Sequence, residues 1–385
     1  MENIVYWAAM AGAAIAFGAI FYVYIGYPLL MFALSRIVRQ AKLETGHYPK
    51  VTFLIAAYNE AESIERKLQE TLALEYPPDK LEILVVSDGS SDGTDELVKN
   101  CQDSRVRLLR VEGRLGKTNA QNKGVEASTG EVIVFSDATA VYHTRALVYM
   151  MQHYADPKVG AVSGRYQYFD PNGASPTGLG SMAFWNYENM IKMYQSQVGT
   201  LTGCSGCIYS VRRSCYVPLA ADVCSDLVEP LRIVRNGYRV AFEPRALAYE
   251  ATTKETKQEF KMRVRVATRG MRGILGSRLL SPAGRPYIAF QLFSHKVMRW
   301  LVPVFLLQFF ASTFVLAFHE PVFANLVGFQ VGFYGMSLLS LKLPLHRASK
   351  LLGLPLFFCT LNAAALVGMI EVIRGQKYTV WETVR

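Results

Sequence analysis

The segments VTFLIAAYNEAESIERKLQE, residues 51–70, and LEILVVSDGSSDGT, residues 81–94, decide the fold of this chain. Each begins with an apolar run typical of a β-strand and then reaches a cluster of polar residues, and an amphipathic helical pattern lies between the two runs. This order predicts a β–α–β unit, whose ligand-binding groups collect at the carboxyl ends of the strands. Carboxylates, rather than a glycine-rich phosphate loop, would face that ligand. The polar residues at the two strand ends are Tyr58, Asn59, Glu60 and Asp88.

The composition indicates that part of the chain lies in a lipid bilayer. Of 385 residues, 51% are hydrophobic, which is too apolar for a wholly soluble protein. Asn3–Ser35 contains no charged residue and exceeds the roughly 20 residues that a spanning helix needs. The basic segment Arg36–Lys42 follows this run, which predicts that the chain from residue 36 onward lies in the cytosol. A cleavable signal peptide is disfavoured, because its basic flank would precede the apolar run.

Three more uncharged stretches occur near the C-terminus: Trp300–Phe318, Pro321–Leu341 and Leu351–Ile370. Each is about long enough to span a bilayer, so the sequence predicts four spans in total. The connector Lys342–Lys350 is basic and suits a cytosolic loop. An even number of spans would leave the basic tail Arg374–Arg385 outside, so the alternative is that one stretch is re-entrant or interfacial.

The formal charge of +10 does not indicate a nucleic-acid partner. Basic residues concentrate between Lys254 and Arg299, without a nucleic-acid-binding signature. An amphipathic helix is expected there, docked on anionic headgroups or presenting a solvated basic face beside the membrane. Its apolar positions are Phe260, Val264, Ala267, Met271 and Ile274, and its basic positions are Lys261, Arg265, Arg269 and Arg272.

Four cysteines lie close together, at positions 204, 207, 215 and 224. Their spacing matches no common zinc site and no histidine lies between them, so we expect buried thiols. A cytosolic domain would also keep them reduced.

The turns Ala57–Glu60 (AYNE) and Val86–Thr94 (VSDGSSDGT) resemble those of membrane-bound, inverting family 2 glycosyltransferases. The resemblance implies an α/β fold class, with a GT-A nucleotide-sugar-binding (Rossmann-like) mixed sheet domain and N- and C-terminal transmembrane helices. In such a domain, the two turns hold the nucleotide of a nucleotide-sugar. The expected organisation is an N-terminal anchor (1–35), a cytosolic GT-A domain (36–250), amphipathic interfacial helices (251–299), about three C-terminal transmembrane helices (300–373) and a tail (374–385).

Glu131–Asp137 (EVIVFSD) reads as a buried strand that delivers Asp137 to the carboxyl edge of the sheet. A hard divalent cation there could bridge a carboxylate and a diphosphate. The family usually has Asp-x-Asp at this point, whereas this chain has a threonine at position 139. The resemblance therefore implies Mg²⁺ or Mn²⁺ held through Asp137, with Thr139 as a doubtful and weaker ligand. Alternatively, Asp137 caps the turn that follows it.

The segment Gly116–Gly124 (GKTNAQNKG) resembles the family's G-K-x-x-A-x-N segment, which lies between the nucleotide and the metal. Lys117 would then stabilise the charge of the departing diphosphate, although it could also be an ordinary surface lysine. Gly203–Gly206 (GCSG) resembles a loop that lets the sugar approach the backbone. The donor-binding residues expected from these motifs are Ala57, Tyr58, Asn59, Glu60, Asp88, Lys117, Asn122, Ser136 and Gly206.

Asp226 is the candidate catalytic base. It lies in residues 224–250, which resemble the family's region around its Thr-Glu-Asp motif. Inversion at the anomeric carbon needs one carboxylate to remove the proton of the acceptor hydroxyl. The alternative is that Asp226 is only the N-cap of a helix.

The family's Gln-x-x-Arg-Trp motif has lost its Gln and Trp in Met262–Val266 (MRVRV), which weakens a processive-polymerase interpretation. Arg265 and Arg269 could still meet an acceptor or a diphosphate. His295–Trp300 (HKVMRW) resembles a motif at the start of the C-terminal spans of membrane-bound members, where Trp300 could also be an interfacial anchor.

Together, these resemblances imply transfer of a sugar, with inversion, from a UDP-linked donor. The acceptor would be lipid-linked or an envelope polysaccharide, at the inner leaflet of the cytoplasmic membrane. Expected partners are the nucleotide-sugar, the lipid-linked or glycan acceptor, membrane lipids and envelope-polysaccharide assembly proteins, without nucleic acid. Two alternatives stay open, a processive synthase that extrudes its polymer and a non-catalytic nucleotide-sugar-binding scaffold.

Overall fold

The computed structural model describes residues 2–38, 43, 45–170, 175–252, 255–276, 280 and 285–380. Residues 39–42 of the predicted basic flank, Lys254 and residues 381–385 of the predicted tail lie outside this range.

An eight-stranded mixed sheet forms the centre of the globular part, with the strand order β3-β2-β1-β4-β7-β6-β8-β5. The predicted β–α–β unit is confirmed, because β1 and β2 pair in parallel around helix α3. β3, β2, β1 and β4 are parallel, β7 is antiparallel to its neighbours β4 and β6, and β5 is antiparallel to β8. The strands are β1 Val51–Ala57, β2 Leu81–Asp88, β3 Val106–Val111, β4 Val132–Asp137, β5 Val141–Tyr142, β6 Val159–Phe169, β7 Tyr209–Arg212 and β8 Arg239–Ala251.

Helices cover both faces of this sheet, which explains why every residue of β1 and β2 is buried. Successive side chains of β1 point to opposite faces: Phe53 and Ile55 pack against one set of helices, and Leu54 packs against the other. The first set is α3 Ile64–Leu72, α4 Thr94–Lys99 and α6 Ala146–Met151, and the second is α5 Lys117–Ala127 and α8 Ser225–Arg235. Short helical turns occur at η2 Pro78–Lys80, η3 Gln152–Ala155 and η4 Arg213–Cys215.

Four helical runs among the described residues are long and apolar enough to cross a membrane, in agreement with the predicted number of spans. They cover Glu2–Ile37, Pro286–Leu316, Pro321–Lys342 and Leu351–Ile373. The first run contains α1 Glu2–Phe21, η1 Tyr22–Gly26 and α2 Tyr27–Ile37, and the second contains α10 Pro286–Leu292, η5 Phe293–Val297 and α11 Met298–Leu316. The third run is α12 Pro321–Lys342. The short helix α13 Leu345–Ala348 follows it, and the fourth run is formed by η6 Lys350–Gly353 and α14 Leu354–Ile373.

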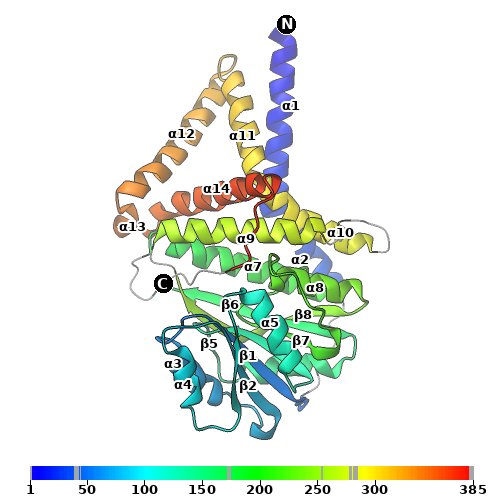
Figure 1. Ribbon diagram of the computed structural model, residues 1–385. Coiled ribbons are helices and arrows are strands. Elements are labelled where there is room, and N and C mark those ends of the chain that lie inside the picture. Colours follow the sequence, from blue (N-terminus) through cyan, green and yellow to red (C-terminus); the bar gives the residue numbers. More distant parts are fainter. Residues whose placement is uncertain are drawn as a thin grey trace.

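Between the sheet and α1, α11 and α12 lies a layer of helices that contains α7 Gly178–Val198, α9 Thr256–Gly276 and α14 (Figure 1). The predicted amphipathic helix is α9, but its apolar residues pack against other helices, mainly α14 and α8. A Cβ added to Gly368 of α14 would lie 3.0 Å from the Cβ of Ala267. Arg269, which the sequence placed on the basic face, is instead buried.

Helix α14 lies across the direction of α1 and alongside α9, whereas α1 and α11 point away from the sheet (Figure 1). The chain after α14 returns to the sheet, where a Cβ on Gly116 would collide with the carbonyl oxygen of Thr379. This arrangement favours the alternative in which one of the four apolar stretches is interfacial.

Candidate functional site

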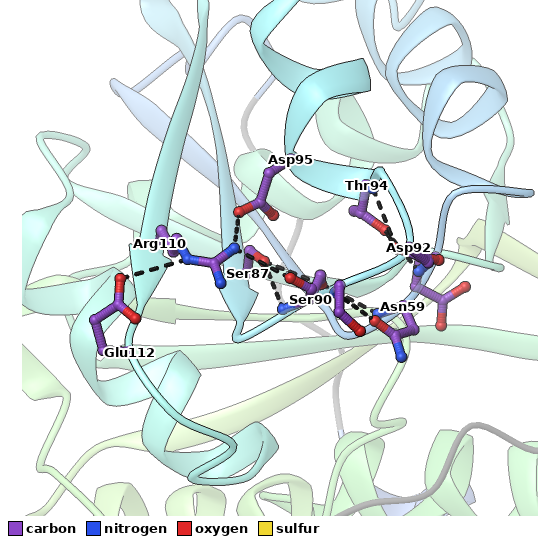
Figure 2. Close-up of polar contacts among 10 residues, drawn as sticks. Asn59, Ser87, Ser90, Asp92, Thr94, Asp95, Arg110 and Glu112 are labelled. Carbon is purple, nitrogen blue, oxygen red and sulfur yellow. Dashed lines mark hydrogen bonds and ion pairs between the residues drawn. The ribbon is translucent and has the colours of Figure 1, made fainter.

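The turns after β1 and β2 are tied together by short polar side chains (Figure 2). The backbone N–H of Asn59 donates to Ser90 Oγ at 3.1 Å, and Asn59 Oδ1 accepts from the N–H of Ser91 at 2.9 Å. Asn59 has a φ of 52°, a left-handed conformation that asparagine adopts more readily than most residues. Asp92 accepts from the N–H of Ala61 and from the hydroxyl of Thr94, which in turn accepts from the N–H of Glu60 at 2.8 Å. The motif thus builds a rigid rim at the carboxyl edge of the sheet.

Asp88 holds the loop that precedes α5. It is fully buried, and its two carboxylate oxygens accept from the backbone N–H groups of Leu115 and Gly116 at 2.9 and 2.8 Å. The guanidinium of Arg114 in the same loop lies 4.3 Å from the centre of the Tyr58 ring. Asp88 therefore shapes the wall of this edge.

Asp137 ends β4 and forms an ion pair with Lys117, the first residue of α5. The pairing disfavours both alternatives from the sequence, the turn cap for Asp137 and the ordinary surface lysine for Lys117. Burial lowers the pKa of Lys117, but the charges of Asp137 and, more weakly, Asp226 raise it above its usual range. The lysine therefore stays charged beside the Asp137 carboxylate.

Thr139 faces another acid, Glu250, at the end of β8. Its hydroxyl donates to Glu250 Oε1 at 2.6 Å, and Tyr166 donates to Oε2 at 2.5 Å. Burial, and then the charge of Asp137, raise the pKa of Glu250. The sequence interpretation missed Glu250, because nothing in the spacing of β8 relates it to Asp137.

The donor atoms present suit a hard divalent cation only in part. Asp137 offers a partly exposed carboxylate, whereas no group of three or more His, Cys, Asp or Glu side chains among the described residues could hold a metal alone. A cation at Asp137 would thus need oxygens from a diphosphate or water. The described cysteines are free; Cys204, Cys207 and Cys215 are buried, as expected, whereas Cys224 is only partly buried.

Asp226 lies in the first turn of α8. The N-cap is Cys224, which makes no side-chain cap, so the N-cap interpretation of Asp226 was wrong. The carbonyl oxygen of Asp226 accepts from the N–H of Cys204 at 2.7 Å. A Cβ added to Gly206 would lie 2.9 Å from Asp226 Oδ2, so the small-residue loop lies directly against the carboxylate.

These elements carry a family signature. Residues 52–217 match the sequence model of the family described as "Glycosyl transferase family 2". This region is a family 2 glycosyltransferase domain. The chain is similar to a poly-beta-1,6-N-acetyl-D-glucosamine synthase of Staphylococcus aureus (strain COL), with 30% identity over 229 residues, 57% of this chain and 54% of the relative. The synthase of the same name from Staphylococcus epidermidis is 29% identical over 229 residues. The chain thus spans about half the length of these curated relatives.

Among solved structures, the fold is similar to the mannosyltransferase PcManGT from Pyrobaculum calidifontis, which was determined in complex with GDP-Man and Mn²⁺. The TM-score is 0.70 at 23% identity, over 97% of this chain and 99% of the mannosyltransferase. This likeness shows the GT-A fold, including the arrangement of the sheet and the apolar helices.

Three of the remaining predicted site residues have side chains that are either hydrogen-bonded within the protein or buried. Asn122 fastens α5 to the segment before α8: its side chain accepts from Tyr216 and from the N–H of Leu219, and donates to the carbonyl of Leu219. Ala57 and Ser136 are buried at the ends of β1 and β4. These contacts favour structural roles, and donor contacts by these residues stay a prediction.

The two arginines predicted to meet the acceptor differ in their surroundings. Arg269 Nη2 donates to Thr118 Oγ1 and to the carbonyls of Ala221 and Val223, so this side chain fixes α9 to α5 and to the segment before α8. Arg265 is partly buried near Tyr378 of the tail. A role for Arg265 at the acceptor stays a prediction, whereas the contacts of Arg269 favour support of the site.

A cavity of about 680 Å³ begins at Asp226 and ends among the apolar helices. Basic side chains that the sequence interpretation did not assign to the site line it, from α7 and from the HKVMRW motif. The residues in question are Lys192, Lys296 and Arg299, which surround the buried Glu188. The motif itself was recognised, but α7 carried no signal because its charges are buried in a helix of mixed composition.

Proposed function

We propose that this protein is a membrane-bound, inverting glycosyltransferase that moves a sugar from a nucleoside-diphosphate sugar to a lipid-linked or envelope-polysaccharide acceptor. The observation that carries this proposal is the ion pair between Lys117 and Asp137 at the carboxyl edge of the sheet, with a weaker electrostatic influence of Asp226 on the same lysine. A displacement at an anomeric carbon needs a positive charge near the leaving diphosphate and a base near the acceptor hydroxyl. Lys117 can supply the charge, and Asp226 can supply the base. UDP is the expected nucleotide.

In this mechanism, Asp226 accepts the proton of the acceptor hydroxyl, and the hydroxyl oxygen forms a bond to the anomeric carbon. The bond between that carbon and the diphosphate oxygen breaks, and the nucleoside diphosphate leaves on the opposite side. Lys117 stays positive and stabilises the charge of the departing diphosphate. Asp137 would hold a divalent cation, Mg²⁺ or Mn²⁺, which supplies further neutralisation of the diphosphate when bound.

The proposed location is the inner leaflet of the cytoplasmic membrane, with the catalytic domain in the cytosol. Arg36, in the last turn of α2, and Arg347, in α13 between two apolar runs, support this orientation, because basic residues are enriched in cytosolic segments next to spans. Membrane lipids are therefore proposed partners, and envelope-polysaccharide assembly proteins are proposed as further partners.

A processive synthase is the second candidate, supported by the names of the Staphylococcus relatives. The absence of Gln and Trp from residues 262–266 argues against it. The decisive measurement is the number of sugars added per acceptor molecule: one sugar supports single transfer, and long products at low turnover support the processive synthase.

The proposal is tested with purified protein, a lipid extract and a panel of radiolabelled nucleotide-sugars. Transfer of one labelled sugar into the lipid fraction is the expected result. Calorimetric titration with UDP and with GDP, each with and without Mn²⁺, separates an enzyme from a scaffold. Nucleotide binding without transfer or hydrolysis of any donor would support the non-catalytic scaffold, which the replacement of the second acid by Thr139 suggests.

A further inference from the structure

The cavity beside Asp226 has two chemically different ends. Gly203, Cys204 and Asp226 line the end at the catalytic domain. Phe333 of α12 and Leu354, Phe357 and Leu361 of α14 line the other end. The cavity thus joins the proposed base to helices that are apolar enough to lie in a membrane.

The apolar end offers little to a polar ligand. Asn362 is a polar residue in this part of the lining, but its amide donates to the carbonyl of Phe358 within α14 at 2.9 Å. A glycan chain there would leave hydroxyl groups without partners, which is unfavourable away from water. A hydrocarbon chain has no hydrogen bonds to lose at this apolar wall, and burial of its surface away from water is favourable.

The middle of the cavity carries an excess of positive charge. Among the described residues that line it, Lys192, Arg263, Lys296 and Arg299 are basic, and Glu188 and Asp226 are acidic. Arg263 is paired with Glu259 at 2.7 Å, outside the lining. Three cations then face two carboxylates, and Asp226 is the group proposed to collect a proton.

The individual contacts show where an anion would bind. Glu188 accepts from Lys296 at 3.4 Å and from Arg299, whereas the Nε of Arg299 is buried and has no hydrogen-bond partner. Lys192, which is 3% exposed, donates to the neutral hydroxyl of Ser205 at 2.8 Å. Burial, and then the charge of Lys296, lower the pKa of Lys192 against smaller opposite effects of Glu188 and Asp226, so this ammonium would gain from a further anion. Buried, uncompensated cations are costly unless an anion joins them.

The cationic group also lies close to the base. A Cβ added to Gly203 would be 3.9 Å from Lys296 Cε and 3.8 Å from the carbonyl oxygen of Asp226. An anion on these side chains would therefore lie near the backbone of Asp226, at the same end of the cavity.

We propose that this cavity binds the acceptor as a lipid phosphate, with the phosphate on Lys192, Lys296 and Arg299 and one hydrocarbon chain between α7, α12 and α14. The inference rests on the proposed function and narrows its acceptor to an amphiphile with an anionic phosphate. The group to be glycosylated then extends from the phosphate toward Asp226, and the chain continues into the bilayer.

Binding is measured without any donor, on full-length protein in phosphatidylcholine nanodiscs, from the fluorescence of Trp185 and Trp300, which line the cavity. The probes are hexadecyl phosphate, hexadecanol, inorganic phosphate and a soluble N-acetylglucosamine oligosaccharide. We expect saturable binding of hexadecyl phosphate, binding of hexadecanol that is about 10- to 100-fold weaker, and none of the other two. Equal binding of the alcohol and its phosphate, or preferential binding of the oligosaccharide, would overturn the proposal.

Lys192→Met removes the charge and keeps the length of the side chain. It should weaken hexadecyl phosphate binding about 10- to 100-fold, while the thermal midpoint of the lipid-free protein stays the same or rises. Lys67→Met is the matched control, because Lys67 is also a fully buried lysine but does not line the cavity. A lower midpoint for Lys192→Met with unchanged affinity would assign Lys192 a purely structural role and overturn the phosphate site.

Two further outcomes separate this inference from the proposed function. Phosphatidylglycerol that competes as well as hexadecyl phosphate would assign the cavity to bulk membrane lipid, which contradicts an acceptor site. Calorimetry on the same samples reports nucleotide binding independently. Binding of the lipid phosphate without binding of a nucleotide would support the cavity site and contradict the proposed glycosyl transfer.

Discussion

The position of the Asp226 carboxylate depends on small residues in the neighbouring loop, Gly203–Gly206. Gly206 lies against its carboxylate, and the N–H of Cys204 fixes its carbonyl. The carboxylate is thus presented at the end of the cavity while its backbone is anchored in α8. A group positioned in this way can act on a proton without a conformational search.

Asp226→Asn removes the base and keeps the shape of the side chain. Turnover should fall by about 10² to 10⁴, the range typical of a lost general base, with little change in donor affinity. Asp222→Asn is the control, because Asp222 is a nearby carboxylate whose partner is Arg272 on α9. Turnover of Asp226→Asn within about threefold of wild type would remove Asp226 from the mechanism.

We predict that Thr139 and Glu250 influence how strongly a cation binds beside Asp137. Thr139→Asp adds an anionic oxygen and should tighten Mn²⁺ binding, but it also adds a like charge beside Glu250. We therefore expect a lower thermal midpoint without metal and a larger gain in midpoint on addition of Mn²⁺. Calorimetry and thermal unfolding with and without EDTA measure both effects. Cation affinity equal to that of wild type would show that positions 137 and 139 do not share an ion.

Glu229, one turn after Asp226 in α8, carries a built-in pH dependence of stability. Burial raises the pKa of Glu229 to about 8, from an ordinary value of 4.5. The folded state holds a proton that the unfolded chain releases, so the stability contribution is complete below pH 4.5 and is lost as the pH rises toward 8. Glu229→Gln should therefore leave the thermal midpoint unchanged at pH 4 and raise it at pH 9. The expected gain in unfolding free energy at pH 9 is on the order of a few kcal/mol. A midpoint difference that is the same at both pH values would contradict the buried, protonated state.

At the scale of elements, the packing of α9 on α14 was not visible in the sequence. The periodicity of residues 260–274 predicted an apolar face, and lipid or another helix can cover such a face equally well. The sheet was more predictable: the apolar runs beginning at Val51 and Leu81 became β1 and β2, because turn residues bound them on both sides. The site divides in the same way. Asp137 and Lys117 follow from motifs, whereas Glu250 and Lys192 reach the site through tertiary contacts between distant segments.

Gly368→Val tests the contact between α9 and α14. The added side chain would meet Ala267 at a position where even a Cβ lies only 3.0 Å away. Overpacking of this kind typically costs about 1–3 kcal/mol, so the thermal midpoint should fall by several degrees. Gly332→Val in α12 is the matched control, because nothing lies within 4 Å of its added Cβ. Equal midpoints for the two variants would show that α9 and α14 are not closely packed in the membrane.

At the scale of the whole molecule, the tail and the glycosyltransferase domain lie on the same side of the apolar helices. The backbone of Thr379 lies against Gly116, which places this part of the tail beside the domain. We propose that α14, which lies beside α9, is the interfacial stretch and that α1, α11 and α12 cross the membrane, which places Arg347 of α13 and Arg374 after α14 on the side of the glycosyltransferase domain. This count reconciles the charge of the tail with the positive-inside rule.

Topology can be checked with two cysteine variants and a membrane-impermeant maleimide on oriented vesicles. His319→Cys lies between α11 and α12, and Gln376→Cys follows α14. We expect labelling of residue 319 from the side opposite the catalytic domain and of residue 376 from the same side as that domain. Labelling of both positions from the side opposite the catalytic domain would show that α14 is a fourth crossing. Labelling of both from the side of that domain would show that α11 and α12 do not form a membrane-crossing hairpin.

The contact of the tail with Gly116 constrains the evolution of two distant positions together. Any side chain at residue 116 would meet the backbone of Thr379, and Gly116 also has a φ of 97°, which disfavours other residues. A substitution on the tail cannot relieve this collision, because the colliding atom belongs to the main chain. Homologues that replace this glycine should therefore be ones in which the tail is shortened or rerouted, and those that keep the tail should keep the glycine.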